Sequence, residues 1–436
     1  MSLRLAAGLL LAVPAFADPS AEALGEVERY VLPRVDMDEV RAADEQRVGR
    51  GEVPFYAVAR EVRISPWSHG DWQPVSEDEA RWRLRLSSPG ARSLNLAFGR
   101  FHMPDGGRLT VASADGRYLI GPFTEADNEP HGQLWTPPIP ASELILDLRV
   151  PVELLEKLEL ELTKVHHGYA GFGEPQPKSG DCHVDVACPE AAPWSDQVRS
   201  VGLISIAGVR FCTGFLINNT ALDGRPFLVT ADHCGIRPSD APSVVVMWNH
   251  QRVTCAGPRP VAWDQFQTGA VFRASHRASD MVLLELDDPP DPAAAVYYAG
   301  WDRSDHDLQG AVTVHHPNTD VKRISLAAGP ADTTWHLARW PVDGGNHLRV
   351  ARWDLGTTEG GSSGAPLFNS DRRVVGQLHG GYAACGNQRA DWFGRLSVAW
   401  DGDGGPGTRL SDWLDPLGSG AVVLDGLDGT VAEPPG

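Results

Sequence analysis

The six cysteines of this 436-residue chain are confined to its second part, and this asymmetry divides the chain into two regions. The cysteines are Cys182, Cys188, Cys212, Cys234, Cys255 and Cys385. A chain of this length is too long for one small core and fits two or three domains. We therefore expect a cysteine-free domain first and a cysteine-containing domain second, joined by the Gly- and Pro-rich segment 171–180.

The N-terminus predicts export, and export predicts that the cysteines are oxidised. Arg4 precedes an apolar stretch that ends at Phe16, and Ala15-Phe16-Ala17 is a small-x-small cleavage site. This layout is typical of a signal peptide over residues 1–17, with a buried N-terminal helix as the alternative. Six cysteines in an exported protein predict three disulfides, for which fifteen pairings are possible. A zinc site is the other possibility, but no C-x-x-C pair occurs.

Composition excludes several partners. The formal net charge of −19 repels nucleic acid phosphates and anionic membranes. Apolar residues at 42% and charged residues at 22% are ordinary for a soluble globular protein, and no later segment is apolar over the length of a membrane span. We expect a soluble protein, secreted to the periplasm or the medium, with no nucleic acid partner and no membrane span.

The region before the linker has the alternating pattern of β-strands. Turn signals such as Pro104-Asp-Gly-Gly107 separate the alternating segments, so a β-sandwich is expected, preceded by a short helix around residues 36–47. No catalytic constellation occurs here. The clearest strand candidates are Arg81–Leu86, Leu94–Phe98, Glu143–Leu148 and Leu158–Thr163.

The region after the linker has many short strand candidates separated by Gly-rich turns, which favours an all-β barrel domain. Residues 409–415 have helical spacing and predict a C-terminal helix, and the tail 425–436 is expected to be loose. The strand candidates are Val201–Ala207, Phe211–Ile217, Pro226–Thr230, Val244–Trp248, Met281–Leu286, Leu348–Trp353, Val374–Leu378 and Phe393–Trp400.

Three segments of the second region contain residues suited to nucleophilic catalysis. His233 ends the apolar strand that begins at Phe227 and is followed directly by Cys234. Asp280 stands immediately before another apolar strand, and Ser363 lies in the Gly-rich turn Glu359-Gly-Gly-Ser-Ser-Gly364. Each residue alone has an ordinary structural explanation: a histidine at a strand end, a capping aspartate, a flexible turn.

Together the three residues match a known chemistry. A serine hydroxyl needs a base to take its proton, histidine can be that base, and a buried aspartate fixes the imidazole tautomer. The chain order His, Asp, Ser is that of chymotrypsin and differs from the subtilisin and α/β-hydrolase orders. Glycines around the serine let backbone N–H groups converge on an oxyanion, and we expect Gly361 and Ser363 to supply them.

The second region, from Ser179 to about Asp428, resembles the bacterial lysyl endopeptidases, a branch of the trypsin-like superfamily. The first region resembles a family propeptide by position only. The matching runs are Asp185–Glu190, Thr230–Gly235, Asp280–Leu286, Ala299–Arg303, His315–Asn318, Lys322–Ser325, Thr358–Pro366, Gly376–Gly381 and Arg409–Pro416.

The resemblance implies a chymotrypsin-like double β-barrel with His233, Asp280 and Ser363 as the catalytic triad. It also implies the disulfides Cys182–Cys385, Cys188–Cys255 and Cys212–Cys234. The chain departs from a family member at Asp232, where that relative has a second histidine. The segment from Cys385 to Asp391 is also shorter than in that relative.

The same resemblance assigns the substrate pocket. Asp391 matches the family's specificity acid, and a buried carboxylate is what a basic side chain needs, because an unpaired buried ammonium costs several kcal/mol. His379 and Trp340 match the stacked pair at the pocket rim, and Gly380 matches the residue that pairs with an extended substrate. An arginine-accepting pocket, a surface ion pair at Asp391 and a core position for Trp340 are the alternatives.

The four lysines of the chain suggest how it matures. They are Lys157, Lys164, Lys178 and Lys322, and Lys178 lies in the linker. We expect self-cleavage after Lys178 to leave Ser179 as the new N-terminus, although a GC-rich genome would also favour arginine over lysine.

The residue before the nucleophile is Ser362. In trypsin-like zymogens an aspartate stands there, pairs with the new N-terminal ammonium group and orders the pocket. Activation of this chain should therefore not depend on such an ion pair. We expect the propeptide to assist folding and to block the site.

These inferences define the expected protein. Residues 1–17 are a signal peptide, 18–178 a β-rich propeptide, 179–424 an all-β serine protease domain with a C-terminal helix, and 425–436 a tail. We expect a monomer that needs no cofactor and no metal, acts on proteins and peptides and associates with its own propeptide. The alternatives are a trypsin-like protease of other specificity, an inactive protease-fold binding protein, and a metal-dependent hydrolase, which lacks an H-E-x-x-H motif.

Overall fold

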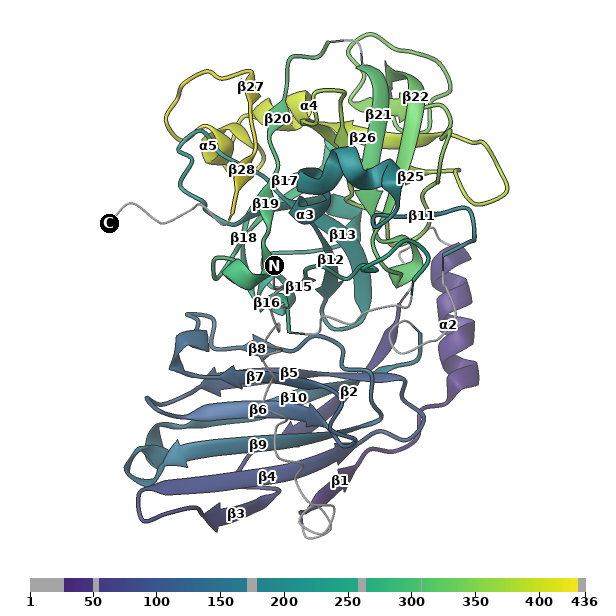
Figure 1. Ribbon diagram of the computed structural model, residues 1–436. Coiled ribbons are helices and arrows are strands. Elements are labelled where there is room, and N and C mark those ends of the chain that lie inside the picture. Colours follow the sequence, from purple (N-terminus) through teal and green to yellow (C-terminus); the bar gives the residue numbers. More distant parts are fainter. Residues whose placement is uncertain (1–26, 50–54, 171–178, 258–263, 307, 430–436) are drawn as a thin grey trace, which may run out of the picture.

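The computed structural model describes residues 27–49, 55–170, 179–257, 264–306 and 308–429. The expected signal peptide, the cleavage bond after Lys178 and the last seven residues lie outside these ranges. The described residues form two regions that lie one above the other, residues 27–170 below and residues 179–429 above (Figure 1). We name them the propeptide region and the protease region after the roles expected from the sequence.

The propeptide region is a sandwich of two sheets, as the alternating pattern predicts. Leucine, valine and phenylalanine side chains from the inner faces of both sheets form one buried core. The first sheet has the order β1-β4-β9-β6-β7 with β3 beside β4, and the second has the order β2-β10-β5-β8. The strands are β1 (Arg29–Val31), β2 (Ala57–Ile64), β3 (Asp71–Pro74), β4 (Glu79–Ser87), β5 (Ser93–His102), β6 (Arg108–Ser113), β7 (Leu119–Phe123), β8 (Leu134–Trp135), β9 (Glu143–Pro151) and β10 (Glu159–Gly168).

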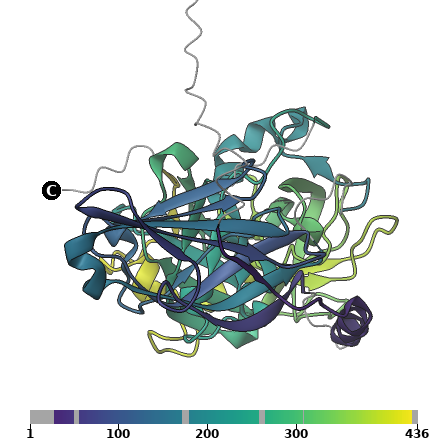
Figure 2. The same ribbon diagram turned by 90° about the horizontal axis from the view of Figure 1, so that it is seen from below.

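The helix α2 (Met37–Gly49) lies between β1 and β2 in the chain, at the position expected from the sequence. Asp36 caps it, because the backbone N–H of Asp38 donates to Asp36 Oδ1 at 2.9 Å. The helix stands at the edge of the molecule (Figures 1 and 2). Asp44, a residue of this helix, accepts a hydrogen bond from the Tyr169 hydroxyl, and this contact connects the helix to the end of the sandwich.

The protease region begins with a seven-stranded antiparallel sheet, which we call the first barrel, in the order β16-β15-β12-β13-β14-β18-β17. Strand β14 pairs with β18 so that Ala231 lies opposite Met281. This register brings the chain just after β14 close to the residue just before β18. The strands are β12 (Val201–Ile206), β13 (Arg210–Leu216), β14 (Phe227–Ala231), β15 (Val245–Met247), β16 (Phe266–Thr268), β17 (Ala270–His276) and β18 (Met281–Leu286).

The second barrel is closed. Its strands follow the order β24-β21-β22-β23-β26-β25, and β24 pairs with β25 to complete the ring. Short strands extend it: β11 (Val184–Asp185) pairs with β22, and β20 (Trp301–Asp302) pairs with β25 and β27 (Val423–Leu424). The ring strands are β21 (Leu308–His315), β22 (Arg323–Thr334), β23 (His347–Val350), β24 (Pro366–Phe368), β25 (Val374–Gly381) and β26 (Asp391–Arg395). The predicted double β-barrel is confirmed.

Two expectations for the C-terminal part are wrong. The strand expected over Phe393–Trp400 ends at Arg395, and α4 (Leu396–Asp401) follows it, because Leu396, Ala399 and Trp400 bury one helical face in the core. The tail is not loose from residue 425, because β28 (Leu427–Asp428) pairs with β19 (Tyr297–Tyr298). The remaining helices are α3 (Ser195–Ser200) and the expected C-terminal helix, which is the short α5 (Ser411–Leu414).

The propeptide region packs against the first barrel. The Tyr56 ring stacks on Phe211 of β13 with 3.9 Å between ring centroids, and its hydroxyl is 2.9 Å from Ser205 Oγ. His131 Nε2 lies 2.9 Å from Asp287 Oδ2 at the other end of this contact. Buried apolar residues between these points include Met247, so the two regions share small cores.

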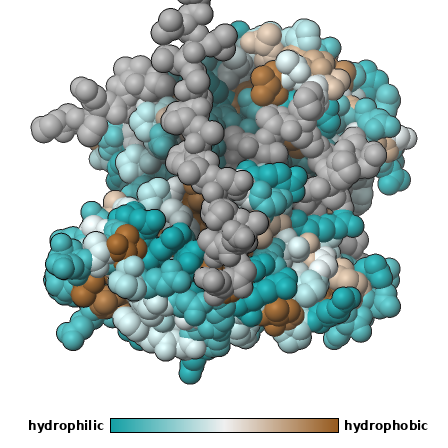
Figure 3. All heavy atoms as spheres, turned by 60° about the horizontal axis from the view of Figure 1, so that its bottom comes forward, coloured by the Kyte–Doolittle hydropathy of each residue, from teal (hydrophilic) through white to brown (hydrophobic). Residues whose placement is uncertain are grey.

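On the face seen in Figure 3, the apolar patches of the described residues are small and are separated by polar ones. Within the described residues, no helix has both the length and the apolar character needed to cross a membrane.

Candidate active site

His233 is held where β14 ends. Residues Asp232–Cys234 form a 3-10 turn that Gly235 terminates with φ +76°, a backbone conformation that glycine adopts without strain. The turn aims the His233 ring toward Asp280. Its neighbour Asp232, the residue that departs from the family pattern, is half-buried, and burial followed by the negative charge of Asp280 raises the pKa of its carboxyl.

Asp280 holds the backbone and the ring of His233. The Asp280 side chain is 3% exposed, and its Oδ1 accepts the His233 backbone N–H at 2.9 Å. Its Oδ2 lies 2.8 Å from His233 Nδ1. Asp280 has φ +56°, a left-handed conformation that ends the turn Arg277–Ser279, and Gln377 of β25 supports this turn by donating to Ser279 O at 2.6 Å. Two hydrogen bonds to one carboxylate fix both the position and the tautomer of the imidazole.

Ser363 completes the line of side chains. Its Oγ lies 2.8 Å from His233 Nε2, on the opposite side of the ring from Asp280. Its carbonyl accepts the N–H of Thr213 in β13 at 2.9 Å, which joins the serine turn of the second barrel to the first barrel. The structure therefore brings together the three residues predicted from separate segments of the sequence.

The glycines around Ser363 are required by space and by backbone conformation. A Cβ on Gly364, which has φ +85°, would lie 2.3 Å from Thr230 Oγ1 and 2.4 Å from Thr213 O. Gly361 has φ +86°, and its carbonyl accepts the Thr213 hydroxyl at 2.9 Å. Among the hydrogen bonds of the described residues, the N–H groups of Gly361 and Ser363 have no acceptor, which leaves both able to bind an oxyanion.

Three disulfides join the pairs that the resemblance implies, Cys182–Cys385, Cys188–Cys255 and Cys212–Cys234. The last of these links the β13 strand to the residue after His233. The first links the beginning of the protease region to the loop before β26. Two of the three bridges thus restrain segments that border the candidate active site.

The ring stacked on His379 is His336 and not Trp340, which corrects the sequence expectation. The His336 and His379 rings are nearly parallel, with centroids 3.5 Å apart, and His379 also lies along His233 with a centroid distance of 5.3 Å. Trp340 is 70% exposed and contacts Arg339 instead. Both residues belong to the connection between β22 and β23, and no periodicity in that loop indicates which ring turns inward.

His347 also belongs to the cluster formed by His233, His336 and His379, and it was not anticipated from the sequence. Its Nε2 lies 2.9 Å from His379 Nδ1, and it is 1% exposed at the start of β23. Burial lowers the pKa of His347 to about 3 and that of His379 to about 4. Both rings are therefore neutral at pH values near 7. A strand residue inside a barrel gives no sequence signal that separates such a histidine from any other core residue.

Asp391 begins β26 and lies against the segment that leads into the serine turn, through its contact with Thr358. It is 1% exposed, and its Oδ2 accepts hydrogen bonds from Trp353 Nε1 at 2.7 Å and Thr358 Oγ1 at 2.6 Å. Burial raises the pKa of this carboxyl, and hydrogen bonds from Thr358, Trp353 and the backbone of Ala383 offset part of that increase. Its Oδ1 has no hydrogen-bond partner of normal geometry among the described residues. A buried carboxylate oxygen without a partner is suited to a cation supplied from outside.

Strand β25 passes directly beside that oxygen. Gly381 lies opposite Asp391 in the β25–β26 pairing, and a Cβ on Gly381 would stand 2.5 Å from Asp391 Oδ1. Gly380, the residue expected to pair with substrate, has φ +132° and no atom within 4 Å of where its Cβ would be. The space beside Gly380 is therefore open to an extended chain.

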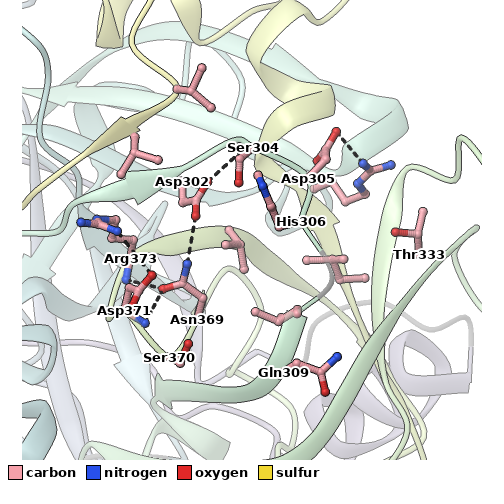
Figure 4. Close-up of a pocket in the computed structure, with 16 residues that line it drawn as sticks. Asp302, Ser304, Asp305, His306, Gln309, Thr333, Asn369, Ser370, Asp371 and Arg373 are labelled. Carbon is pink, nitrogen blue, oxygen red and sulfur yellow. Dashed lines mark hydrogen bonds and ion pairs between the residues drawn. The ribbon is translucent and has the colours of Figure 1, made fainter.

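A cavity of about 540 Å³ lies elsewhere on the second barrel, and none of the predicted site residues lines it. Two of its carboxylates have partners within the lining: Asp305 pairs with Arg395 at 2.7 Å, and Asp302 accepts a hydrogen bond from the Asn369 amide at 3.2 Å (Figure 4).

Comparison with known proteins identifies the family of the chain. The family model described as lysyl endopeptidase, C-terminal domain, matches residues 176–394, half of the chain. The chain is 26% identical to a lysyl endopeptidase of Pseudomonas aeruginosa over 359 residues, which cover 75% of each protein. Similar solved structures include human heparin binding protein, at 18% identity and a TM-score of 0.35 over 52% of this chain and 94% of that one. They also include the Rv3671c protease of M. tuberculosis in its active form, at 18% identity and a TM-score of 0.31 over 51% and 90% of the two chains. The chain belongs to the lysyl endopeptidase family and is a trypsin-like serine protease.

Proposed function

We propose that this protein is a secreted serine endopeptidase that hydrolyses peptide bonds on the carboxyl side of lysine and is made as a precursor. The observation that carries the catalytic part is the position of the His233 imidazole, hydrogen-bonded on one side to Asp280 and on the other to Ser363. The observation that favours lysine is the unpartnered Oδ1 of buried Asp391.

The geometry supports acyl transfer in two stages. In the first, Ser363 Oγ attacks the peptide carbonyl while His233 Nε2 takes its proton, and the N–H groups of Gly361 and Ser363 bind the oxyanion. The imidazolium then gives this proton to the leaving amine, whose bond to the carbonyl carbon breaks. In the second stage His233 takes a proton from water, the hydroxide attacks the acyl-enzyme, and the proton returns to Ser363 as the acid leaves.

A fluorophosphonate probe tests the catalytic part. It should label the protein once, at Ser363, and Ser363→Ala should abolish both labelling and peptide hydrolysis. Labelling of the Ser363→Ala variant at a similar rate would show that another nucleophile acts. Absence of any labelling in the correctly processed protein would favour an inactive binding protein with this fold.

Digestion of a mixed set of proteins tests the specificity. Asp391 should select a cationic side chain, because a buried carboxylate favours a partner of opposite charge. We expect lysine to precede nearly every cut in the wild type, with cleavage after lysine lost in Gly381→Ala, whose Cβ would crowd Asp391 Oδ1. Frequent cuts after arginine would instead support a general trypsin-like pocket.

The start of the protease region is consistent with processing after Lys178. Ser179 is 3% exposed, and its hydroxyl donates to Asp320 Oδ2 at 2.6 Å, while its backbone N lies 3.3 Å from the same oxygen. A chain that begins at Ser179 would thus place its new amino group beside a carboxylate. N-terminal sequencing of the secreted wild type and of Ser363→Ala should show Ser179 only in the wild type. The same N-terminus in both would mean that another protease performs the cut.

A further inference from the structure

A hydrogen-bonded chain leads from the turn before Asp280 to the ring that lies along His233. It starts at Asn346, just before β23, continues through His347 and ends at His379 in β25. Asn346 Oδ1 lies 2.7 Å from His347 Nδ1, and His347 Nε2 lies 2.9 Å from His379 Nδ1. Neither Asn346 nor His347 contacts the reacting atoms in the candidate site described above.

The direction of each hydrogen bond in this chain is determined by its first member. The Asn346 side-chain amide donates from Nδ2 to the carbonyl of Ala278, so its Oδ1 faces His347 and can only accept. His347 Nδ1 must therefore carry the hydrogen, and in a neutral ring Nε2 then has the lone pair. His379 Nδ1 must in turn carry a hydrogen and donate it to His347 Nε2. One asparagine thus sets the tautomers of two histidines.

The tautomer of His379 matters because of what lies nearby. His379 Nδ1 is 3.7 Å from Asp280 Oδ2, the same oxygen that lies 2.8 Å from His233 Nδ1. If the N–H of His379 lost its acceptor on His347, Asp280 Oδ2 would be the nearest charged acceptor. His379 would then compete with His233 for the carboxylate that the triad requires.

We propose that Asn346 and His347 are positioning residues, which fix the tautomer of His379 and so reserve Asp280 Oδ2 for the catalytic histidine. This proposal rests on the proposed function, since it concerns the same triad. The titratable groups that face His379 are His233 and Asp280 on one side and His336 and His347 on the other. Of these, Asp280 is the one carboxyl group.

The test replaces His347, which accepts the hydrogen bond from His379, by a residue with a ring of similar size. His347→Phe should lower kcat on a lysyl ester by about tenfold with little change in KM. It should also move the acid limb of the kcat/KM profile to lower pH, because a shared Asp280 stabilises the His233 imidazolium less. His347→Gln, whose amide offers one donor and one acceptor, should retain most of the wild-type rate and the wild-type pH profile.

A second substitution separates this role from a merely structural one. His379→Phe removes the N–H that would compete for Asp280, so adding His347→Phe to it should cause no further shift of the acid limb. Equal shifts in both backgrounds, or an unshifted limb in His347→Phe, would overturn the proposal. If His347→Phe does not fold, Asn346→Ala provides the test, because it frees the His347 tautomer and should shift the limb in the same direction.

The outcomes also distinguish this proposal from the proposed function. All variants are first titrated with the fluorophosphonate probe to count active sites. A wild type that neither reacts nor hydrolyses the ester contradicts the proposed function itself. A wild type that is active, with a His347→Phe variant identical to it in kcat and in pH profile, contradicts only the positioning role.

Discussion

Asp280 makes two distinct contacts with His233, and they have different consequences. The contact with the backbone N–H fixes the turn, while the contact with Nδ1 fixes the proton on the ring. A substitution of Asp280 that preserves its shape but removes its charge separates the two contacts. The backbone N–H of His233 needs only an acceptor, whereas the His233 ring needs a carboxylate.

We expect Asp280→Asn to fold normally and to lose activity. The amide can still accept the His233 N–H, but it can present its NH₂ to Nδ1 and so favour the wrong imidazole tautomer. The loss in kcat should be about 10⁴-fold, as for the corresponding change in a well-studied serine protease. Ester hydrolysis measured beside circular dichroism checks this, and a variant within tenfold of the wild type would show that Asp280 is not required.

Asp391 should make folding less favourable at neutral pH, because the pocket that contains it has no cation of its own. Burial raises its pKa in the folded protein, whereas the unfolded chain has the ordinary value. The folded state thus holds the proton more tightly. The contribution of this group to stability is fully present below the ordinary aspartate pKa and is lost as pH rises through the folded pKa.

Asp391→Asn should therefore raise the Tm at about pH 7 and have little effect at about pH 3, below the ordinary pKa. The amide oxygen can still accept from Trp353 and Thr358, and its NH₂ takes the place of the unpartnered Oδ1. Thermal unfolding of the Ser363→Ala form at both pH values avoids self-digestion. A Tm gain of equal size at both would contradict a charge effect.

At the scale of elements, the ends of strands position the residues of the candidate active site. His233 follows β14, Asp280 precedes β18, and the β14–β18 register brings the two together. Sequence patterns predict strand ends of this kind well, because an apolar run and the polar residue beside it are both visible. The three residues of the proposed triad could therefore be selected from the sequence, as could most strands of both regions.

Other features of the site depend on contacts that no pattern encodes. The β22–β23 loop contains His336 and Trp340, and only packing decides that His336 covers His379. The change from β26 to α4 occurs within an apolar run whose residues Phe393 to Trp400 fit a strand as well as a helix. Likewise, the pairing of Leu427–Asp428 with β19 depends on a strand more than a hundred residues away in the chain.

The Cys212–Cys234 bridge should affect catalysis as well as stability. Replacing both cysteines by serine should lower the free energy of unfolding by about 3 kcal/mol, by the loop-entropy estimate for a separation of 22 residues. Because Cys234 follows His233, kcat should fall too. Denaturant unfolding and ester kinetics measure the two effects.

The Cys188–Cys255 bridge is the matched control. It closes 67 residues, so its removal should cost about 4 kcal/mol by the same estimate, but it lies away from the histidine turn. Its loss should therefore leave kcat unchanged at temperatures where the protein remains folded. An equal decrease in kcat for both double variants would show that the Cys212–Cys234 bridge has no special effect on the base.

For the whole molecule, the contact between the propeptide region and the first barrel suggests how the precursor folds. Strands β12 and β13, which precede the histidine strand, form part of this contact through Ser205 and Phe211. A propeptide that binds these strands early would stabilise the first barrel before the second closes. We therefore expect residues 179–436 expressed alone to give a low yield of active enzyme.

Tyr56→Ala should reduce that yield when the full chain is expressed. The change removes a fully buried ring and its hydrogen bond, which typically costs about 3–5 kcal/mol for a large aromatic residue. The specific activity per titrated active site should stay constant, because the mature enzyme lacks this residue. Trp67→Ala, at an exposed position of the propeptide region, is the control, and an equal yield from both variants would argue against the contact.

The placement of lysines has a consequence for the lifetime of the enzyme. After processing at residue 178, the protease region would retain one lysine, Lys322, which is 0% exposed and whose Nζ donates to the Val198 carbonyl at 2.8 Å. Lys157 and Lys164 of the propeptide region are exposed or half-exposed. With the proposed lysine specificity, a concentrated solution of the enzyme would destroy its released propeptide, whereas the one lysine of the protease region is buried in each folded copy. Inactivation would then follow the rate at which the barrels open.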